Sequence, residues 1–184
     1  MRYVALLRGI NVGGNAVVAM KRLKRMFEDL GCLEVSTFIN SGNVLFLDKR
    51  TAAELAPVIE RAILDTFGFT VPTILRSQSN LEKLCQAIPQ TWTNDGDQKT
   101  DVLFLWDAID SPEITKRIVT NPELERVKYL PGALVWNIDR ANATRGSSVK
   151  LIKSDLYKSV TVRNISTVRK LNALLQKTDE AHHS

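Results

Sequence analysis

The stretch "VSTFINSGNVLFLD", Val35–Asp48, contains two runs rich in β-branched and aromatic residues on either side of Ser41 and Gly42. A two-residue connection with glycine between such runs is typical of a tight β-hairpin, because glycine tolerates a positive φ. We therefore predict strands over Val35–Asn40 and Asn43–Asp48. The elements that flank this hairpin decide which fold contains it.

A helix and a further strand are expected on each side of the hairpin. Tyr3–Arg8 has the pattern of a strand, and Ala19–Leu30 has that of an amphipathic helix. After the hairpin, Thr51–Phe67 is predicted to be a helix and Val71–Arg76 a strand. The resulting β-α-β-β-α-β order is typical of a ferredoxin-like fold.

The same order recurs less clearly in the second half of the chain. The expected elements are strand Asp101–Trp106, helix Pro112–Val119, strands Leu124–Leu130 and Ala133–Ile138, helix Ser148–Lys158 and strand Ser159–Arg163. We predict an α+β protein built as a tandem duplication of two ferredoxin-like (βαββαβ) subdomains with a C-terminal helix. The predicted boundaries are 1–76 for the first subdomain, 77–100 for a joining helix and linker, 101–163 for the second subdomain, and 164–184 for the C-terminal helix and tail. The alternative is one mixed α+β domain.

The segment "RGINVGGN" at 8–15, between the first strand and the first helix, is rich in glycine and has no hydrophobic period. In a ferredoxin-like sheet the first and third strands are antiparallel neighbours, so Arg8 should approach Asn43 and the loop should meet the hairpin. The loop lacks both the Lys-Ser/Thr of a P-loop and the glycine spacing of a dinucleotide fingerprint. Backbone N–H groups beside Lys21 and Arg22 still predict an anion-binding nest. The alternative is a βα turn that only shapes the fold.

A second polar group stands between the last strand and the terminal helix, where Arg163 and Asn164 are adjacent. Asparagine at such a boundary is also typical of a turn or a helix cap. Arginine offers a donor fork that suits phosphate or carboxylate, and asparagine offers both donors and acceptors. We predict one anionic-ligand site formed by Arg8, Gly9, Asn11, Gly13, Gly14, Ser41, Asn43, Arg163 and Asn164, with Arg145 and Lys150 as weaker additions.

The sequence lacks the residues that several kinds of catalysis require. Its only histidines are His182 and His183, so no internal imidazole can act as a base or a metal ligand. Cys32 and Cys85 are too few for a disulfide framework and are expected to be buried. We therefore predict no metal and no cofactor, and the sequence identifies no catalytic residue.

The net charge of +5 is unevenly distributed along the 184 residues. Residues 1–25 carry six basic and no acidic residues, 26–139 carry ten basic and 17 acidic residues, and 140–177 carry nine basic residues and one acidic residue. Two basic ends that meet in space would attract phosphate groups or nucleic acid, whereas the alternative is ordinary solvated helix surface. No apolar run reaches the roughly 18 residues of a membrane span. We expect no membrane partner and a reducing, cytoplasmic location.

Several blocks of the sequence carry a family resemblance. They are "LLRGINVGG" with the following Met20, "STFINSGNVLF" at Ser36–Phe46, "SSVKL", and "VTVRNISTVRKL" at Val160–Leu171. In this order they resemble the signature blocks of the domain-of-unknown-function 1697 family of small bacterial proteins. The resemblance implies tandem ferredoxin-like subdomains and no established activity.

Three functional hypotheses are consistent with these observations. The favoured one is binding of a small phosphate-bearing or other anionic ligand through the RGINVGG loop. The second is a nucleic-acid-binding module that uses the basic N- and C-terminal segments. The third is a structural or interaction protein without a ligand. A compact pocket at the loop would favour the first hypothesis, and a longer positive groove would favour the second.

Overall fold

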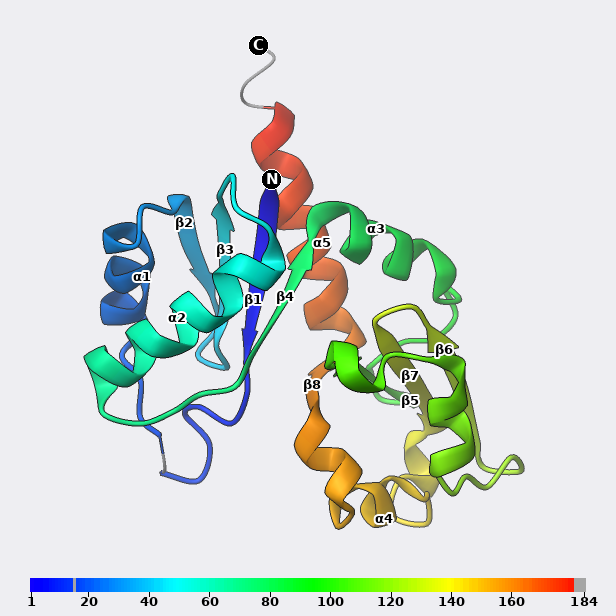
Figure 1. Cartoon of the computed structure of the whole chain (residues 1–184). Helices are drawn as coiled ribbons and strands as arrows, with labels where there is room; N and C mark the ends of the chain where they lie inside the picture. Colours follow the sequence, from blue (N-terminus) through cyan, green and yellow to red (C-terminus); the bar gives the residue numbers. More distant parts are fainter. Residues whose placement is uncertain (15, 181–184) are drawn as a thin grey trace. The chain divides into compact units, whose positions relative to one another are not determined.

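The computed structural model of the protein describes residues 1–14 and 16–180 and shows a mixed α+β architecture (Figure 1). The strands are β1 (Arg2–Leu7), β2 (Leu33–Phe38), β3 (Asn43–Leu47), β4 (Thr73–Ser77), β5 (Gln98–Leu105), β6 (Glu125–Leu130), β7 (Ala133–Asp139) and β8 (Val160–Asn164). The α-helices are α1 (Met20–Asp29), α2 (Ala52–Phe67), α3 (Gln78–Ala87), α4 (Ser148–Ile152) and α5 (Ile165–Glu180). Short 3-10 helices are η1 (Asp107–Ile109), η2 (Pro112–Arg117), η3 (Arg140–Asn142) and η4 (Asp155–Ser159).

The chain divides into two compact units. The first comprises Met1–Leu81 together with the end of the chain from Leu171, and the second comprises Glu82–Lys170. Over the described residues, the strands form one four-stranded antiparallel sheet in each unit rather than one continuous sheet. The boundary between the units falls inside α3, and the chain re-enters the first unit inside α5.

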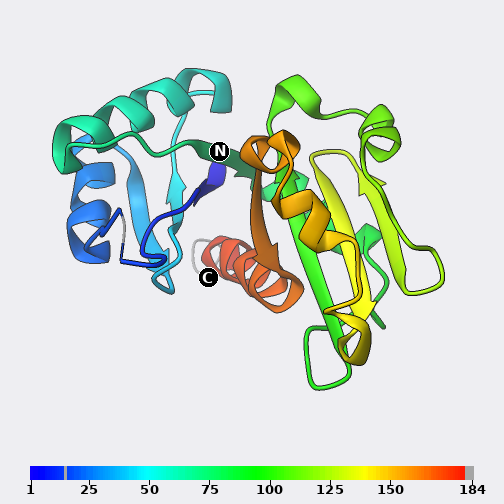
Figure 2. The ribbon, with the colours of Figure 1, turned by 90° about the horizontal axis from the view of Figure 1, so that it is seen from below.

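The first unit has the β-α-β-β-α-β element order expected from the sequence, with strand order β2-β3-β1-β4. The hairpin turn is longer than predicted, because β2 ends at Phe38, which pairs with Asn43, so that residues 39–42 and not Ser41-Gly42 alone connect the two strands. Helices α1 and α2 cover one face of this sheet (Figures 1 and 2). Phe27 of α1 and Ile59 of α2 are fully buried in the same cluster as Ala5 and Val44 of the central strands. Burial of this apolar face provides the main driving force for folding of the unit.

Local sequence signals determine where α2 begins and ends. Thr51 and Glu54 form a capping box at the helix start, in which the Thr51 side chain accepts from the Glu54 backbone N–H. Gly68 ends the helix in the left-handed conformation, with φ of 82°. These residues lie within the segment that they cap, which explains why the predicted helix Thr51–Phe67 is close to the observed one.

The second unit has the strand order β6-β7-β5-β8, the same arrangement that the first unit shows for its corresponding strands. Its helices are shorter than the sequence predicts. The helix expected over Ser148–Lys158 is divided into α4 and η4, because the Ser154 hydroxyl donates to the Leu151 carbonyl at 2.7 Å and the chain extends at Ser154. The helix expected over Pro112–Val119 is the 3-10 helix η2. Among the residues that the structure describes, no helix is both long and apolar enough to cross a membrane.

Candidate functional site at the glycine-rich loop

The loop between β1 and α1 uses glycine to turn the backbone. Gly9, Gly13 and Gly14 have φ values of 72°, 62° and 79°, all in the left-handed region. A Cβ built on any of the three would meet no atom within 4 Å, so conformation rather than close packing requires glycine there. Ile10 and Val18 are buried and anchor the two ends of the loop in the core of the first unit.

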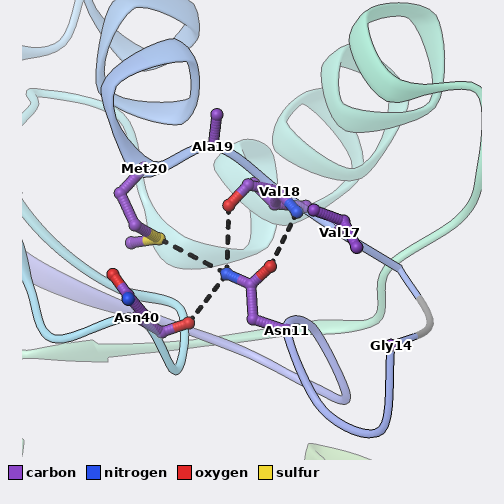
Figure 3. A pocket seen from close by; sticks show the side chains of 7 residues that line it. All are labelled: Asn11, Gly14, Val17, Val18, Ala19, Met20 and Asn40. Carbon is purple, nitrogen blue, oxygen red and sulfur yellow. Dashed lines mark hydrogen bonds between the residues drawn. The ribbon is translucent and has the colours of Figure 1, made fainter.

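Asn11 holds the loop in this conformation (Figure 3). Its Oδ1 accepts from the Val18 backbone N–H at 2.8 Å, and its Nδ2 donates to the Val18 carbonyl at 3.0 Å. The same Nδ2 donates to the carbonyl oxygen of Asn40 at 2.8 Å. The predicted ligand-binding residue Asn11 therefore uses both amide protons to close the loop and to attach it to the hairpin.

The loop and the β2–β3 hairpin meet at one edge of the sheet, as the strand order predicts. Leu6 pairs with Asn43, and the Leu7 backbone N–H donates to the Gly42 carbonyl at 2.9 Å. The side chain of Asn43 is fully buried, where Nδ2 donates to the Phe38 carbonyl and to the Ser41 hydroxyl, both at 3.0 Å. Asn43 thus shapes the hairpin from inside, and Ser41 is the more accessible of the two predicted site residues.

A pocket of about 430 Å³ lies where the loop, the hairpin and the start of α1 meet (Figure 3). Its lining combines loop, hairpin and helix residues, namely Asn11, Gly14, Val17, Val18, Ala19, Met20 and Asn40. The volume lies within the range of roughly 300–1,000 Å³ that is usual for small-molecule sites. The predicted convergence of loop and hairpin therefore coincides with an open pocket whose volume is that of a small-molecule site.

The electrostatics of this pocket come from the N-terminus of α1. Ala19 occupies the N-cap position, and no side chain among the described residues caps the helix there. The first turn contains no acidic residue, and it carries Lys21 and Arg22. Because the helix dipole places partial positive charge at this end, the uncapped N–H groups and the two cations favour an anion at the helix start.

Arg8 begins the loop but does not belong to the described lining of the pocket. Its backbone N–H donates to the Pro72 carbonyl at 2.9 Å, and its side chain is half-buried. The remaining predicted residues belong to the second unit.

Arg163 and Asn164 have structural contacts at the end of β8. The residue Arg163 is 8% exposed, and its guanidinium donates to the Thr161 hydroxyl at 3.1 Å and to the Val162 carbonyl at 2.8 Å. Burial lowers the pKa of Arg163 to about 10. Oδ1 of Asn164 accepts from the Thr167 backbone N–H at 2.8 Å, which makes Asn164 the N-cap of α5.

The weaker additions Arg145 and Lys150 are both exposed in the segment from η3 to α4. The described residues contain no cluster of His, Cys, Asp and Glu that could hold a metal ion. His182 and His183, the two histidines of the sequence, lie outside the described residues. The described structure therefore offers the first unit's pocket as the place where the predicted loop residues and a cavity coincide.

Sequence reasoning missed the part of the pocket that the helix start provides. Val17, Ala19 and Met20 line it, although none of them has a side chain that suggests ligand binding. One signal was present in the sequence, because the helix begins after alanine rather than after Ser, Thr, Asp or Asn. An uncapped helix after a glycine-rich loop indicates exposed N–H donors.

Comparisons with known proteins place this chain in a family. Residues 1–136 match the family model DUF1697, described as a protein of unknown function. Among solved structures, the chain is similar to the conserved bacterial protein SP0830 from Streptococcus pneumoniae. The two are 27% identical with a TM-score of 0.83, and the match covers 95% of this chain and 98% of that chain. No curated protein matches the chain. The glycine-rich loop and the hairpin both fall within the matched region, and the chain belongs to the DUF1697 family of proteins of unknown function.

Proposed function

We propose that the first unit binds a small phosphate-bearing or other anionic ligand at the pocket beside the glycine-rich loop. The observation that carries this proposal is the uncapped start of α1, which lines a cavity of about 430 Å³. Lys21 and Arg22 in the first turn place positive charge beside the positive end of the helix dipole, which is unfavourable. An anion in the pocket would offset this repulsion. The ligand would accept hydrogen bonds from backbone N–H groups at the helix start.

The positive charge that attracts the anion comes from Lys21 and Arg22 beside the pocket and not from the residues that line it. No lysine or arginine belongs to the lining that the structure describes, which consists of apolar and amide side chains and one glycine. We infer that the apolar wall contacts an uncharged part of the ligand, and that its anionic group faces the start of α1. A nucleotide or a sugar phosphate has both parts.

A pair of substitutions at Ala19 tests the proposal, because Ala19 is an exposed N-cap residue. Ala19→Asp should stabilise the apo protein by about 0.5–2 kcal/mol through capping, while its carboxylate occupies the anion site. Ala19→Ser should also cap the helix but adds no negative charge. Arg25→Ala removes an exposed charge beyond the first turn of α1 and serves as the control.

The measurement is the thermal shift produced by inorganic phosphate, a nucleoside monophosphate and a sugar phosphate. A ligand that binds only the folded state raises its melting temperature. We expect a shift in the parent protein and in Arg25→Ala, a smaller shift in Ala19→Ser, and none in Ala19→Asp. If none of the three probes shifts the parent protein, or if Ala19→Asp is stabilised and keeps the full shift, the proposal is wrong.

Arg8 provides a second test of the same site. We propose that its side chain assists anion binding at the edge of the pocket, so Arg8→Ala should weaken binding of the phosphate-bearing probe by about 1.5–3 kcal/mol. The far-UV spectrum and the melting temperature should stay close to those of the parent. Unfolding of Arg8→Ala without a specific loss of affinity would show that Arg8 maintains the fold instead.

Exposed apolar side chains at this edge favour a second candidate function, namely a protein contact. Val12, Val17 and Ile39 are 66%, 70% and 50% exposed, and the bond from Asn11 to Asn40 joins their two segments. Contiguous exposed apolar surface is typical of interaction sites. A Val12→Ser and Ile39→Ser double variant, which leaves the pocket lining intact, would support this alternative if it loses a partner but keeps the phosphate shift.

Nucleic-acid binding is a further outcome that salt distinguishes. A single anionic group in a compact pocket should show a shallow dependence of affinity on salt. A surface that neutralises several phosphates loses affinity steeply as salt rises. A steep dependence with single-stranded or duplex DNA, and no shift with nucleotides, would favour the basic-segment hypothesis.

We also infer that the two units are ferredoxin-like repeats. The shared strand order, β2-β3-β1-β4 in one sheet and β6-β7-β5-β8 in the other, supports a duplication. Superposition of the two units is the test.

We further infer that the protein is cytoplasmic. Cys32 and Cys85 are free and buried, which is consistent with a reducing compartment. Cell fractionation is the test.

A further inference from the structure

The second unit contains a pocket of its own, of about 220 Å³, between its sheet and the helical segment α4–η4. Its apolar wall includes Leu103 of β5, Trp136 of β7 and Leu151 of α4. These three side chains are buried and belong to the core cluster of the unit. In Figure 2 the gold and orange helical segment from α4 crosses one face of this sheet. The pocket is therefore a partly open hollow whose floor is formed by core side chains.

A buried carboxylate positions two walls of the pocket. Oε2 of Glu125 accepts from Nε1 of Trp136 at 3.0 Å and from the backbone N–H of Ser147, the N-cap residue of α4, at 3.0 Å. Oε1 accepts from the Asn121 backbone N–H at 2.8 Å. Because one side chain holds both the indole and the start of α4, the pocket is preorganised.

One positive and one negative side chain line the polar side of the pocket. Lys99 and Asp101 lie two positions apart on β5, both line the pocket, and Nζ of Lys99 is 3.2 Å from Oδ2 of Asp101. Both side chains are partly exposed, so solvent and ligand can reach them. An incoming ligand with one positive and one negative group would satisfy both without leaving a net charge at the apolar wall.

The volume of the pocket limits the size of the ligand that it can hold. The volume is below the roughly 300–1,000 Å³ of pockets that hold drug-sized molecules. Ile152 also lines the pocket and is 55% exposed, which leaves apolar surface available to a ligand. A branched aliphatic or aromatic group of amino-acid size fits the apolar wall, and a zwitterionic head group fits the charged pair.

We propose that this pocket binds a free α-amino acid with a large apolar side chain, such as leucine or phenylalanine. The apolar side chain contacts Trp136, Leu151 and Ile152, the carboxylate pairs with Lys99, and the ammonium pairs with Asp101. The pocket lies wholly within the second unit, so this inference is independent of the anion site at the glycine-rich loop.

The test is a titration of the full chain with L-leucine and L-phenylalanine. The readout is the position of the ¹H–¹⁵N NMR signals of the tryptophan indoles. The chain has three tryptophans, and Trp136→Phe assigns the signal of Trp136 by its disappearance. We expect this indole signal to move with either amino acid while the signals of Trp92 and Trp106 stay in place. An unmoved Trp136 signal up to the solubility limit of both amino acids would overturn the proposal.

Two ligand analogues and one substitution test the roles of the charges. 4-Methylpentanoate lacks the ammonium of leucine and should bind the parent protein more weakly, because Asp101 repels its carboxylate. Asp101→Asn should weaken leucine binding by about tenfold or more, as expected for loss of a charged hydrogen bond. The same variant should bind 4-methylpentanoate better than the parent does, an exchange of preference that a fold defect would not produce.

Matched controls separate the pocket from the surface around it. Ile152→Ala should weaken leucine binding, whereas Val119→Ala should not, since Val119 is 63% exposed and lies outside the described lining of the pocket. Lys158→Ala breaks the exposed Lys158–Asp155 ion pair and should also leave binding unchanged. Equal binding of leucine by the parent, Asp101→Asn and Ile152→Ala would place the amino acid elsewhere and contradict the proposal.

Discussion

The Nδ2 atom of Asn11 donates to the carbonyl oxygen of Asn40 at 2.8 Å and thereby joins the glycine-rich loop to the β2–β3 hairpin. The two residues are 29 positions apart, so this bond exists only in the folded chain. The same amide forms a reciprocal pair with the backbone of Val18. One side chain therefore sets the shape of the pocket by holding loop, hairpin and helix entry together.

Replacement of Asn11 by glycine should destabilise the protein. Asn11 has a φ of 55°, and glycine adopts this value without strain, so Asn11→Gly removes the amide contacts while the backbone conformation stays accessible. We expect the free energy of unfolding to fall by about 1–3 kcal/mol, measured by urea denaturation. The control is Asn40→Ala, which keeps the backbone carbonyl that accepts the bond. Equal losses in the two variants would contradict the assigned role.

Gly42 should tolerate substitution less well than Gly13. A Cβ on Gly42 would lie 2.8 Å from Ile10 Cδ1 and 2.8 Å from Leu7 Cβ, whereas Gly13 has open space around it. Both residues have positive φ, so alanine should cost about 1–2 kcal/mol at either position. Overpacking should add about 1–3 kcal/mol at Gly42. Similar urea midpoints for Gly42→Ala and Gly13→Ala would show that the hairpin relaxes around the new methyl group.

Asp48 should make stability depend on acid pH. Its Oδ2 is 2.6 Å from Nη2 of Arg50, its Oδ1 accepts from Nε of Arg50 at 3.0 Å, and these bonds hold the pKa of Asp48 well below its usual range. A carboxylate with a lowered folded-state pKa contributes stability above its unfolded value of about 4, and this contribution is lost as the pH falls below that value. We expect Asp48→Asn to be less stable at pH 7 by about 1–3 kcal/mol.

The pH dependence of the two proteins provides the decisive comparison. The free energy of unfolding should decrease more gently in Asp48→Asn than in the parent as the pH is lowered from about 5. Glu28→Gln is a suitable control, because Glu28 is an exposed carboxylate in the same unit and lies 3.7 Å from the exposed Lys24. Parallel pH profiles for the parent and Asp48→Asn would show that Asp48 does not contribute to acid sensitivity.

The two cysteines should be unreactive in the native protein. Burial, with a smaller contribution from the hydrogen bond to Asp48, raises the pKa of the Cys32 thiol to about 12, and burial raises that of Cys85 to about 11. The thiolate is the reactive form, so labelling by a disulfide reagent at pH 8 should be slow until denaturant is added. Ser36→Cys places an exposed thiol on β2 as a positive control. Native Cys32 or Cys85 that reacts as fast as this control would contradict the described burial.

Much of the first unit could be predicted because its signals are local. Gly42 lies between two β-rich runs, and Thr51, Glu54 and Gly68 delimit α2 through contacts within a few residues. The second unit was harder to predict from periodicity. The helix predicted over Ser148–Lys158 is interrupted where the hydroxyl of Ser154 donates to the Leu151 carbonyl. Periodicity alone does not reveal that a side chain competes for the backbone carbonyl in this way.

The amino-acid sequence by itself determined the order of strands and helices in the first unit and the presence of a hairpin whose turn ends at Gly42. Only the tertiary structure decided what the polar residues do, because asparagine, glutamate and arginine can contact either a ligand or distant parts of the chain. The amide of Asn11 bonds to Asn40, the side chain of Asn43 is buried in the hairpin, and Glu125 is held by backbone N–H groups and an indole. Their partners become neighbours only when the sheets form, and burial then makes those hydrogen bonds obligatory.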